Sequence, residues 1–335
     1  MKVIVPMAGM GKRLRPHTLT TPKPLLPIAG KPIVQRLVED IVAISDQKVE
    51  EIAYVVGRFG TEAENHLIQV AESLGAKGTI HYQDQPLGTA HAILCAQSAL
   101  DGPVTVAFAD TLFRADFQLD TTKDGVLWVQ KIEDPRQFGV VIVNDEGIIT
   151  EFREKPTEFV SDLAMIGIYY FKDGNRLKEE LQYLIDNNIM NAGEYQLPDA
   201  LRNMVKKGAR FAPGTVSDWM DCGNKAAMID TNNKMLGYLG ENNGSSQPST
   251  SGEVKIIAPC YIGKDVKLHN VTIGPHVSLG DGCSVSDSQI DHSIVMLNTK
   301  IHNSKLTNSM IGSFTEIHHF SGDLSLGDYS TIKPS

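Results

Sequence analysis

A repeat near the end of the chain constrains the fold more than any other feature. Aliphatic residues recur there at steps of five or six residues, and glycine follows several of them. The repeat comprises Ile262-Gly263, Leu268, Ile273-Gly274, Leu279-Gly280 and Val285, with further aliphatic-glycine pairs at Ile311-Gly312 and Leu326-Gly327. Six-residue steps with an inward aliphatic side chain and a glycine at the corner are typical of a parallel β-helix, whose stacked coils close the core. An irregular glycine-rich β-sandwich is the alternative.

The first 240 residues show a different pattern, in which predicted strands alternate with predicted helices. Apolar runs predict strands at 2–8, 51–57, 79–83 and 103–110, and helical spacing predicts helices at 32–44, 61–75 and 88–100. This alternation predicts a largely parallel sheet covered on both faces. In such folds, ligands bind beyond the carboxyl ends of the strands. Because Met7–Pro16, Gln83–Thr89 and Asp110 all fall at the carboxyl ends of predicted strands, we expect them to meet in space.

The middle of the chain is richer in strands. Apolar runs at 126–132, 138–145, 148–156 and 164–171 predict a mixed extension of the sheet, followed by helices at 175–188, 197–208 and 225–240. Residues 241–252, ENNGSSQPSTSG, contain a proline and no apolar residue, which is typical of a linker. We therefore predict an α/β domain with a Rossmann-like mixed sheet over 1–240, a linker over 241–252 and a β-helix over 253–335.

Charge is unevenly spread along the chain. The formal net charge of −9 argues against nucleic acid or an anionic membrane as a partner. The first acidic residue is nevertheless Glu39. The cations that precede it are Lys2, Lys12, Arg13, Arg15, Lys23, Lys31 and Arg36. This cationic opening predicts either a local anion site or a solvated basic face.

Cysteine usage and hydropathy bear on the compartment. The four cysteines, Cys95, Cys222, Cys260 and Cys283, show neither CxxC pairing nor metal-type spacing, which favours a reducing cytoplasm. The short apolar N-terminal stretch is followed by basic residues where a signal peptide would have its cleavage site. No apolar run approaches the roughly 20 residues of a membrane span. We expect a cytoplasmic protein.

The stretch MAGMGKRLRP, residues 7–16, is the strongest candidate for an anion site. Gly9 and Gly11 follow a predicted strand, but there is no third glycine for a dinucleotide fingerprint and no GxxxxGK[ST] phosphate loop. What remains is a glycine loop with Arg13 embedded in it, followed by TPKPLLPIAGKP. Backbone N–H groups together with Arg and Lys side chains can hold a polyphosphate.

Five motifs in this order resemble those of the sugar-1-phosphate nucleotidylyltransferases. They are AGMGKRLRPHTLTTPKPLLPIAGKP, QDQPLGTAHAI, FADT, EFREKP and DWMDCGN. The long members of this family also carry a left-handed hexapeptide β-helix, so the resemblance covers nearly the whole chain. One departure is Lys12, which stands where the family usually has threonine.

The resemblance implies a reaction, its substrates and its cofactor. An NTP and a sugar-1-phosphate would give an NDP-sugar and pyrophosphate, with Mg²⁺ bound by one or two carboxylates and the phosphates. A Gln amide suits the imide edge of uracil or thymine, so dTTP or UTP is expected as the nucleotide and glucose-1-phosphate as the sugar. Formation of UDP-N-acetylglucosamine and a GDP-mannose-type reaction are the alternatives.

The resemblance also implies roles for single residues. Arg13 and Lys23 are the expected catalytic residues, and Asp110 and Asp221 the expected metal ligands. For nucleotide binding we expect Gly9, Gly11, Gln83, Gly88 and Thr89. For sugar-phosphate binding we expect Gly139, Glu154, Lys155, Tyr169 and Glu194.

Several of these residues also have purely structural interpretations. Asp110 and Thr89 could each be a helix N-cap, and Glu194 could be an acid in the first turn of a helix. Asp218 competes with Asp221 as the second metal ligand.

Two other function classes fit parts of the sequence. Six of the ten histidines lie in the repeat region, as in a hexapeptide acyltransferase that uses histidine as a base. The second class is a non-catalytic regulatory homologue. Such a protein would be expected to lack Arg13, Lys23 or the expected metal ligands Asp110 and Asp221, but all four are present. We favour a role for the repeat in homo-oligomer assembly, or no catalytic role.

Overall fold

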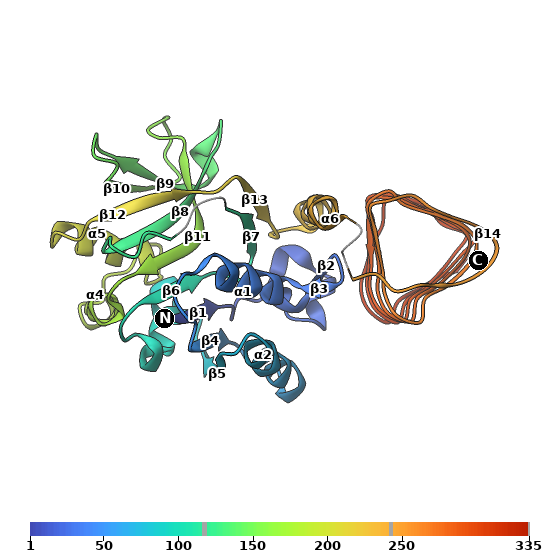
Figure 1. Ribbon diagram of the computed structural model, residues 1–335, viewed down its shortest axis with the longest axis horizontal. Coiled ribbons are helices and arrows are strands. Elements are labelled where there is room, and N and C mark those ends of the chain that lie inside the picture. The colour runs from blue at the N-terminus through green and yellow to red at the C-terminus, as the bar shows by residue number, and fades with distance from the viewer. Residues whose placement is uncertain (116–118, 241–243, 334–335) are drawn as a thin grey trace. The chain divides into compact units, whose positions relative to one another are not determined.

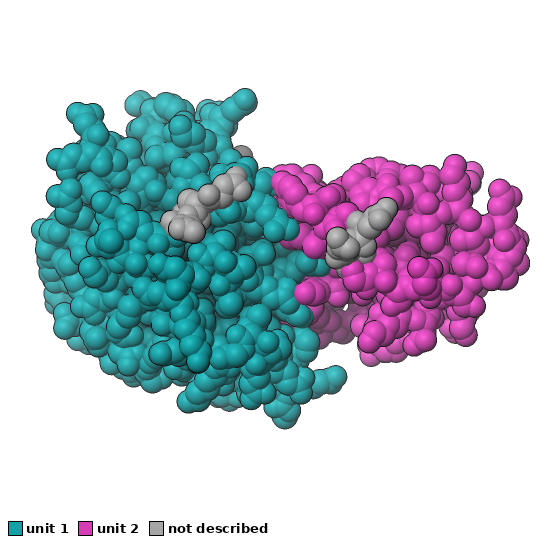
Figure 2. All heavy atoms as spheres, viewed as in Figure 1, with its two compact units in different colours: residues 1–9, 34–219 teal, residues 10–33, 220–335 magenta. Residues whose placement is uncertain are grey.

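The structure is a computed structural model that describes residues 1–115, 119–240 and 244–333. It divides into two compact units, shown in Figure 2: unit 1 comprises 1–9 and 34–219, and unit 2 comprises 10–33 and 220–335. The segment 10–33, which carries Arg13 and Lys23, is therefore grouped with the C-terminal residues. The expected domain boundaries stay a prediction. Within the expected linker, residues 241–243 lie outside the described residues and strand β14 already begins at Ser249.

Unit 1 is built on a nine-stranded mixed sheet (Figure 1). Its strands are β1 (Lys2–Pro6), β4 (Glu51–Val56), β5 (Lys77–Tyr82), β6 (Val104–Ala107), β8 (Gly125–Lys131), β9 (Gly139–Val143), β10 (Ile149–Glu154), β11 (Leu163–Phe171) and β12 (Phe211–Thr215). The strand order is β10-β9-β11-β6-β1-β4-β5, and β8 pairs with both β11 and β12. Strands β6, β1, β4 and β5 are parallel neighbours, whereas β11 is antiparallel to β6 and β8. The expected mixed extension is confirmed.

The helices of this part of the chain follow the predicted spacing. They are α1 (Ile33–Ile44), α2 (Thr61–Ser73), α3 (Thr89–Cys95), α4 (Gly174–Asp186) and α5 (Leu197–Lys206). The helix expected over 88–100 is shorter than predicted: it ends at Cys95, and a separate 3₁₀ turn follows at Gln97–Ala99. Ile93, Leu181 and Leu201 from α3, α4 and α5 share a core with Phe171 and Phe211 of the sheet. Two short strands, β7 (Thr111–Arg114) and β13 (Asp218–Asp221), complete the region.

The segment 10–33 of unit 2 has little regular structure of its own. Three short 3₁₀ turns, Lys12–Leu14, His17–Leu19 and Lys23–Leu25, precede the two-residue strands β2 (Pro27–Ile28) and β3 (Lys31–Pro32). Helix α6 (Lys225–Leu239) belongs to the same unit.

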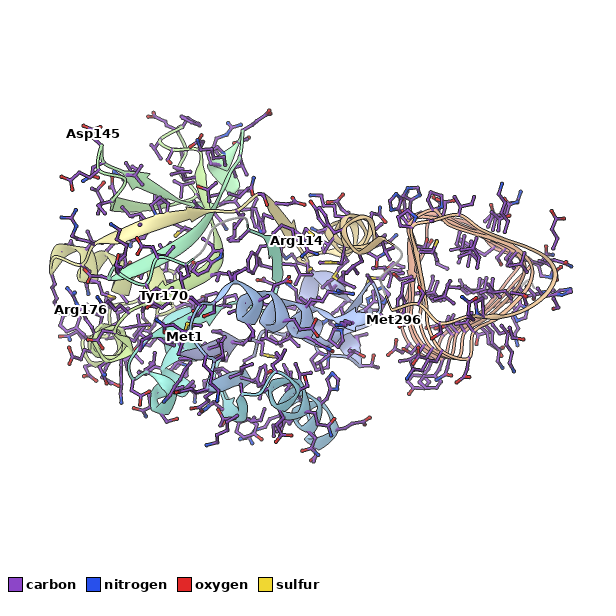
Figure 3. The ribbon with its side chains drawn as sticks, viewed as in Figure 1. Met1, Arg114, Asp145, Tyr170, Arg176 and Met296 are labelled. Atoms are coloured by element: carbon purple, nitrogen blue, oxygen red, sulfur yellow. The ribbon has the colours of Figure 1, made fainter. Side chains whose placement is uncertain are left out.

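The repeat region of unit 2 is a parallel β-helix, as predicted, with coils of three-sided outline (Figure 1). One ladder contains β14 (Ser249–Ile256), β16 (Lys267–Ile273), β18 (Ser284–Ile290), β20 (Lys300–His302), β23 (Glu316–His318) and β26 (Thr331–Ile332), with β21 (Lys305–Leu306) and β24 (Ser321–Gly322) beside it. The other contains β15 (Cys260–Ile262), β17 (Val277–Leu279), β19 (Ser293–Val295), β22 (Met310–Ile311) and β25 (Ser325–Leu326). Side chains stack in layers from coil to coil (Figure 3).

The coils are shorter than three full hexapeptides. Ile262, Leu279, Val295, Ile311 and Leu326 are successive partners, so each coil advances by 15 to 17 residues. Left-handed backbone at the corners makes this possible, and the ladder Asn270, Asp287, Asn303 and His319 is one such corner. Asn, Asp and His tolerate this conformation better than most residues.

The glycines of the aliphatic-glycine pairs mostly serve close approach of adjacent coils. A β-carbon placed on Gly280 would lie 2.7 Å from the backbone nitrogen of Leu297 in the next coil. Within the described ranges, no helix is long and apolar enough to cross a membrane.

Candidate functional site

Three predicted site residues follow parallel strands of unit 1. Gly9 follows β1, Gln83 follows β5 and Asp110 follows β6. Since β6, β1, β4 and β5 run in the same direction, these residues lie along one edge of the sheet. For this part of the chain, the expected gathering at the carboxyl ends of the strands agrees with the fold.

The amide of Gln83 has a fixed orientation. Its Nε2 donates to the carbonyl oxygen of Gly88 at 3.1 Å and to Nδ1 of His91 at 3.1 Å. A backbone carbonyl only accepts hydrogen bonds, so the NH₂ group and not the oxygen must face Gly88. This arrangement leaves the carbonyl oxygen, an acceptor, as the group that Gln83 can offer to a base.

His91 supports this orientation from the first turn of α3. Its Nδ1 can accept from Gln83 only when that nitrogen carries no proton, so the ring is neutral with its proton on Nε2. Burial lowers the pKa of His91, which favours the neutral ring. His91 lies within the helix predicted over 88–100, and no role was predicted for it. The sequence feature that could have pointed to His91 is its position three residues after Gly88, on the first turn of the predicted helix.

Gly88 allows the closest backbone approach in this region. Its φ of +107° is a conformation that residues with a side chain rarely adopt. A β-carbon there would lie 2.4 Å from the carbonyl oxygen of Tyr195 and 2.9 Å from Cβ of Glu194. The backbones also exchange hydrogen bonds, from Tyr195 N to Leu87 O at 2.8 Å and from Ala90 N to Tyr195 O at 2.9 Å. The loop with Glu194 therefore packs directly on the loop with Gln83.

The hydroxyl of Thr89 links the same two loops. It donates to Oε1 of Gln196 at 3.1 Å and accepts from the backbone nitrogen of Leu197 at 2.9 Å. Gln196 in turn donates to Oε2 of Glu194 at 2.8 Å. The N-cap of α3 is Gly88 and that of α5 is Gln196, so neither Thr89 nor Glu194 has the structural role weighed for it. Nothing in the sequence pattern pointed to Gln196.

Asp110 lies in the turn between β6 and β7, so no helix follows it and the N-cap alternative is wrong. Nearby, Tyr169 on β11 pairs in register with Val106 of β6. Burial raises the pKa of Tyr169, and the negative charges of Glu154 and Asp110 raise it further. Asp110 and Glu154 therefore both act electrostatically on this one phenol.

Gly139 and Glu154 are partners across the β9-β10 hairpin. A β-carbon on Gly139 would lie 2.8 Å from Oε2 of Glu154, so the glycine lets this carboxylate lie against the backbone. Lys155 follows with φ +43°, a left-handed conformation, and its backbone nitrogen donates to Phe138 O at 3.1 Å. A lysine in this conformation is strained by about 1 kcal/mol, and such strain is concentrated at functional sites.

The remaining predicted residues belong to unit 2. A β-carbon on Gly223 would lie 3.0 Å from both carboxylate oxygens of Asp221 and 3.1 Å from Nη2 of Arg13. The guanidinium and the carboxylate therefore converge over Gly223, a position that sequence analysis did not single out. A β-carbon on Gly11, at φ +56°, would lie 3.1 Å from Cβ of Lys23. Arg13 with Asp221, and Gly11 with Lys23, are thus neighbouring pairs.

The carboxylates suit magnesium chemistry. Among the described residues, no group of three or more His, Cys, Asp or Glu side chains could hold a metal ion alone. Mg²⁺ does not need such a group, because it binds through one or two carboxylates and substrate phosphates. Asp110 and Asp221 are half-buried carboxylates at strand ends and fit that use. Lys12 is exposed, and nothing in the structure explains its charge.

Known proteins show similarity along the whole chain. A family model described as Nucleotidyl transferase matches residues 2–237. A glucose-1-phosphate thymidylyltransferase of Streptomyces griseus is 28% identical over the full length of both chains. A bifunctional protein GlmU of Methanococcus vannielii is 29% identical, covering 93% of this chain and 78% of that protein.

Another relative is described as having a different activity. The mannose-1-phosphate guanylyltransferase catalytic subunit beta of Drosophila pseudoobscura is 29% identical over 85% of this chain and 72% of its own. Among solved structures, a Bacillus anthracis protein described as a glucose-1-phosphate thymidylyltransferase superposes with a TM-score of 0.56. It is 23% identical and covers 69% of this chain and 93% of its own, which shows a shared fold. With its glycine loop, strand-end acids and family match over residues 2–237, the chain belongs to the nucleotidyl transferase family.

Proposed function

We propose that this protein transfers a nucleotidyl group from dTTP or UTP to a sugar-1-phosphate, with glucose-1-phosphate as the first candidate. The products are an NDP-sugar and pyrophosphate. The observation that carries the proposal is the fixed amide of Gln83, whose oxygen is the group offered to a base. The full-length similarity to a glucose-1-phosphate thymidylyltransferase supports the choice of sugar.

The base preference follows from hydrogen-bond chemistry. Uracil and thymine carry an N–H donor at N3, which pairs with the oxygen of Gln83. Cytosine and adenine carry an acceptor at the equivalent ring nitrogen, so their lone pair would face this oxygen. Guanine has an N–H donor at N1 and suits Gln83 on this ground. GTP with mannose-1-phosphate is therefore the second candidate, favoured by the relative described as a guanylyltransferase.

The reaction needs positioning and charge neutralisation rather than a covalent nucleophile. A phosphate oxygen of the sugar-1-phosphate bonds to the α-phosphorus of the NTP while the bond to the pyrophosphate oxygen breaks. In the proposed scheme, Arg13 holds the triphosphate with its planar fork and Lys23 neutralises the phosphate undergoing transfer. Asp110 and Asp221 would hold Mg²⁺, which supplies further neutralisation of phosphate charge.

The sugar side is assigned to residues of unit 1. Glu154 offers carboxylate oxygens to sugar hydroxyls, and Lys155 offers a cation to the sugar phosphate. Gly139 offers its backbone to the sugar beside Glu154, because the absence of a side chain leaves room next to that carboxylate. Glu194, held by Gln196 at 2.8 Å, and the buried Tyr169 complete the proposed sugar pocket.

A panel of the common NTPs against sugar-1-phosphates, read by pyrophosphate release in millimolar Mg²⁺, tests the proposal. We expect turnover with dTTP or UTP and loss of that selectivity in Gln83→Glu, whose carboxylate cannot donate to Gly88. Preference for ATP or CTP would contradict the role of Gln83. No pyrophosphate with any pair would refute the reaction itself. Homo-oligomer formation stays a prediction, and a monomer by light scattering would reject it.

A further inference from the structure

The middle of the segment 10–33 contacts the last coil of the β-helix. A β-carbon on Gly327 would lie 2.9 Å from Cβ of Pro16, so the last coil packs directly against this proline. Nε2 of His17 lies 3.1 Å from Oγ of Ser325, and the hydroxyl of Thr20 donates to Oδ2 of Asp328 at 2.6 Å. These contacts join residues more than 300 positions apart in the sequence.

The held residues lie between the two cations assigned to phosphate. Pro16 is three residues after Arg13, and Thr20 is three residues before Lys23. His17 is only 1% exposed and its Nε2 contacts Ser325, so the centre of this segment is buried where it meets the last coil. The segment itself contains three-residue turns and two-residue strands, and such short elements do not fix a backbone without packing from outside.

A second set of contacts holds the end of the segment. Oδ1 of the buried Asn232 on α6 accepts from the backbone nitrogen of Ala29 at 2.9 Å and from Oγ of Ser278 on the β-helix at 2.8 Å. The ring of Tyr261 lies against Gly30, where a β-carbon would be 2.2 Å from Cζ. Segment, helix α6 and β-helix therefore share one buried hydrogen-bond centre.

From these contacts, we propose that the β-helix is a positioning element for nucleotidyl transfer: through Ser325, Gly327 and Asp328 its last coil fixes the backbone that carries Arg13 and Lys23. Asp328, Ser325 and His17 are positioning residues in this scheme and do not touch substrate. The inference rests on the proposed function for the roles of the two cations. A displacement of about 1 Å at a phosphate-holding group can lower the rate on the order of 100-fold.

Two matched aspartates allow a direct test. Oδ1 of Asp328 accepts from the backbone nitrogen of Ser313 at 2.7 Å, and Oδ1 of Asp281 accepts from that of Lys264 at 2.8 Å, so both support a corner of the β-helix. Only Asp328 is seen to bind Thr20 as well, within the described ranges. Asp328→Ala removes the corner bond and the link, Asp281→Ala removes a corner bond alone, and Thr20→Val removes the link alone.

We expect kcat to fall on the order of tenfold in Asp328→Ala and in Thr20→Val, with Asp281→Ala within about twofold of the parent protein. The double variant Thr20→Val/Asp328→Ala should be no slower than Asp328→Ala, because both changes remove one shared link. If all three single variants share the parent's kcat, the inference is wrong. If Asp328→Ala does not fold, Thr20→Val decides alone.

Hydrogen exchange of the full-length protein provides a readout independent of activity. The backbone nitrogens of Leu14, Leu19 and Leu26 donate within the 3₁₀ turns at 2.9, 3.1 and 3.1 Å. We expect these amides to exchange faster in Thr20→Val and unchanged in Asp281→Ala. Unchanged exchange in Thr20→Val overturns the inference. If the parent protein releases no pyrophosphate, the proposed function fails, and exchange alone then decides whether the β-helix positions the segment.

Discussion

Two glycines at equivalent helix starts allow the steric demand of the nucleotide loop to be measured. Gly60 precedes α2 with φ 90° and ψ 157°, and Gly88 precedes α3 with φ 107° and ψ 178°. Each carbonyl accepts a hydrogen bond from the first helical turn, from Glu64 at 3.1 Å and Ala92 at 3.0 Å. Among the described residues, a β-carbon on Gly60 would have no neighbour within 4 Å, whereas one on Gly88 would meet Tyr195 O at 2.4 Å.

The expected cost of alanine at each position follows from these two environments. Both substitutions force a side chain into a backbone region used almost solely by glycine, which costs about 1–3 kcal/mol. Gly88→Ala adds a collision with backbone that cannot rotate away, at about 1–3 kcal/mol. We therefore expect Gly88→Ala to be the more destabilising of the two by about 1–3 kcal/mol.

Urea unfolding followed by tryptophan fluorescence measures the difference in free energy of unfolding in unit 1, which contains Gly60 and Gly88. The chain has two tryptophans, Trp128 and Trp219, and both belong to unit 1. We also expect KM for the NTP to rise in Gly88→Ala alone, because the carbonyl oxygen of Gly88 holds the amide of Gln83. Equal free energies of unfolding and equal KM values in the two variants would refute the steric reasoning.

Three further outcomes are expected. Burial lowers the pKa of His17 to about 4 from an ordinary 6.5. Between pH 6.5 and 4, His17 therefore binds a proton in the unfolded chain but not in the folded chain, which destabilises the folded state. Amide protection of 10–33 should weaken between pH 6.5 and 4 by up to about 3 kcal/mol, and this pH dependence should be absent in His17→Gln. Burial also lowers the pKa of His91. Protonation of the ring below that pKa removes the acceptor for the amide of Gln83, so KM for the NTP should rise as the pH falls. A KM that rises equally in His91→Leu would contradict this. Arg13→Ala and Asp110→Asn should lower turnover by orders of magnitude with circular dichroism unchanged, and near-normal rates in either variant would overturn the role given to that residue.

The fold was predictable wherever a local pattern reports burial. The run Lys2–Pro6 is buried from Val3 onward, and the other central strands follow equally apolar runs. The six-residue step predicted the β-helix because each face must bury one aliphatic side chain per coil. The helix ending at Cys95 was predicted too long, because the apolar residues that follow it, such as Ala99, are buried in a 3₁₀ turn and carry the same hydropathy signal.

The candidate site was predictable in its motifs but not in its supports. Arg13, Asp110 and Gln83 stand within short stretches that a sequence pattern can recognise. The contact of His17 with Ser325 spans 308 positions, and no local pattern reports it. The hydrogen bond from Gln196 to Glu194 lies in a loop whose Tyr195 backbone packs on Gly88, and no local pattern reports that packing between residues far apart in the sequence. Residues that position other residues therefore need the structure.

Three of the six histidines of the repeat region have an explanation in coil geometry. His276, His292 and His319 occupy left-handed corner positions, with φ of 61°, 41° and 56°. Coils of 15 to 17 residues need such tight corners, and His, like Asn and Asp, is enriched in this conformation. The positions of these three histidines therefore follow from coil geometry, and the contact of His17 with Ser325 supports the proposed positioning role of the last coil.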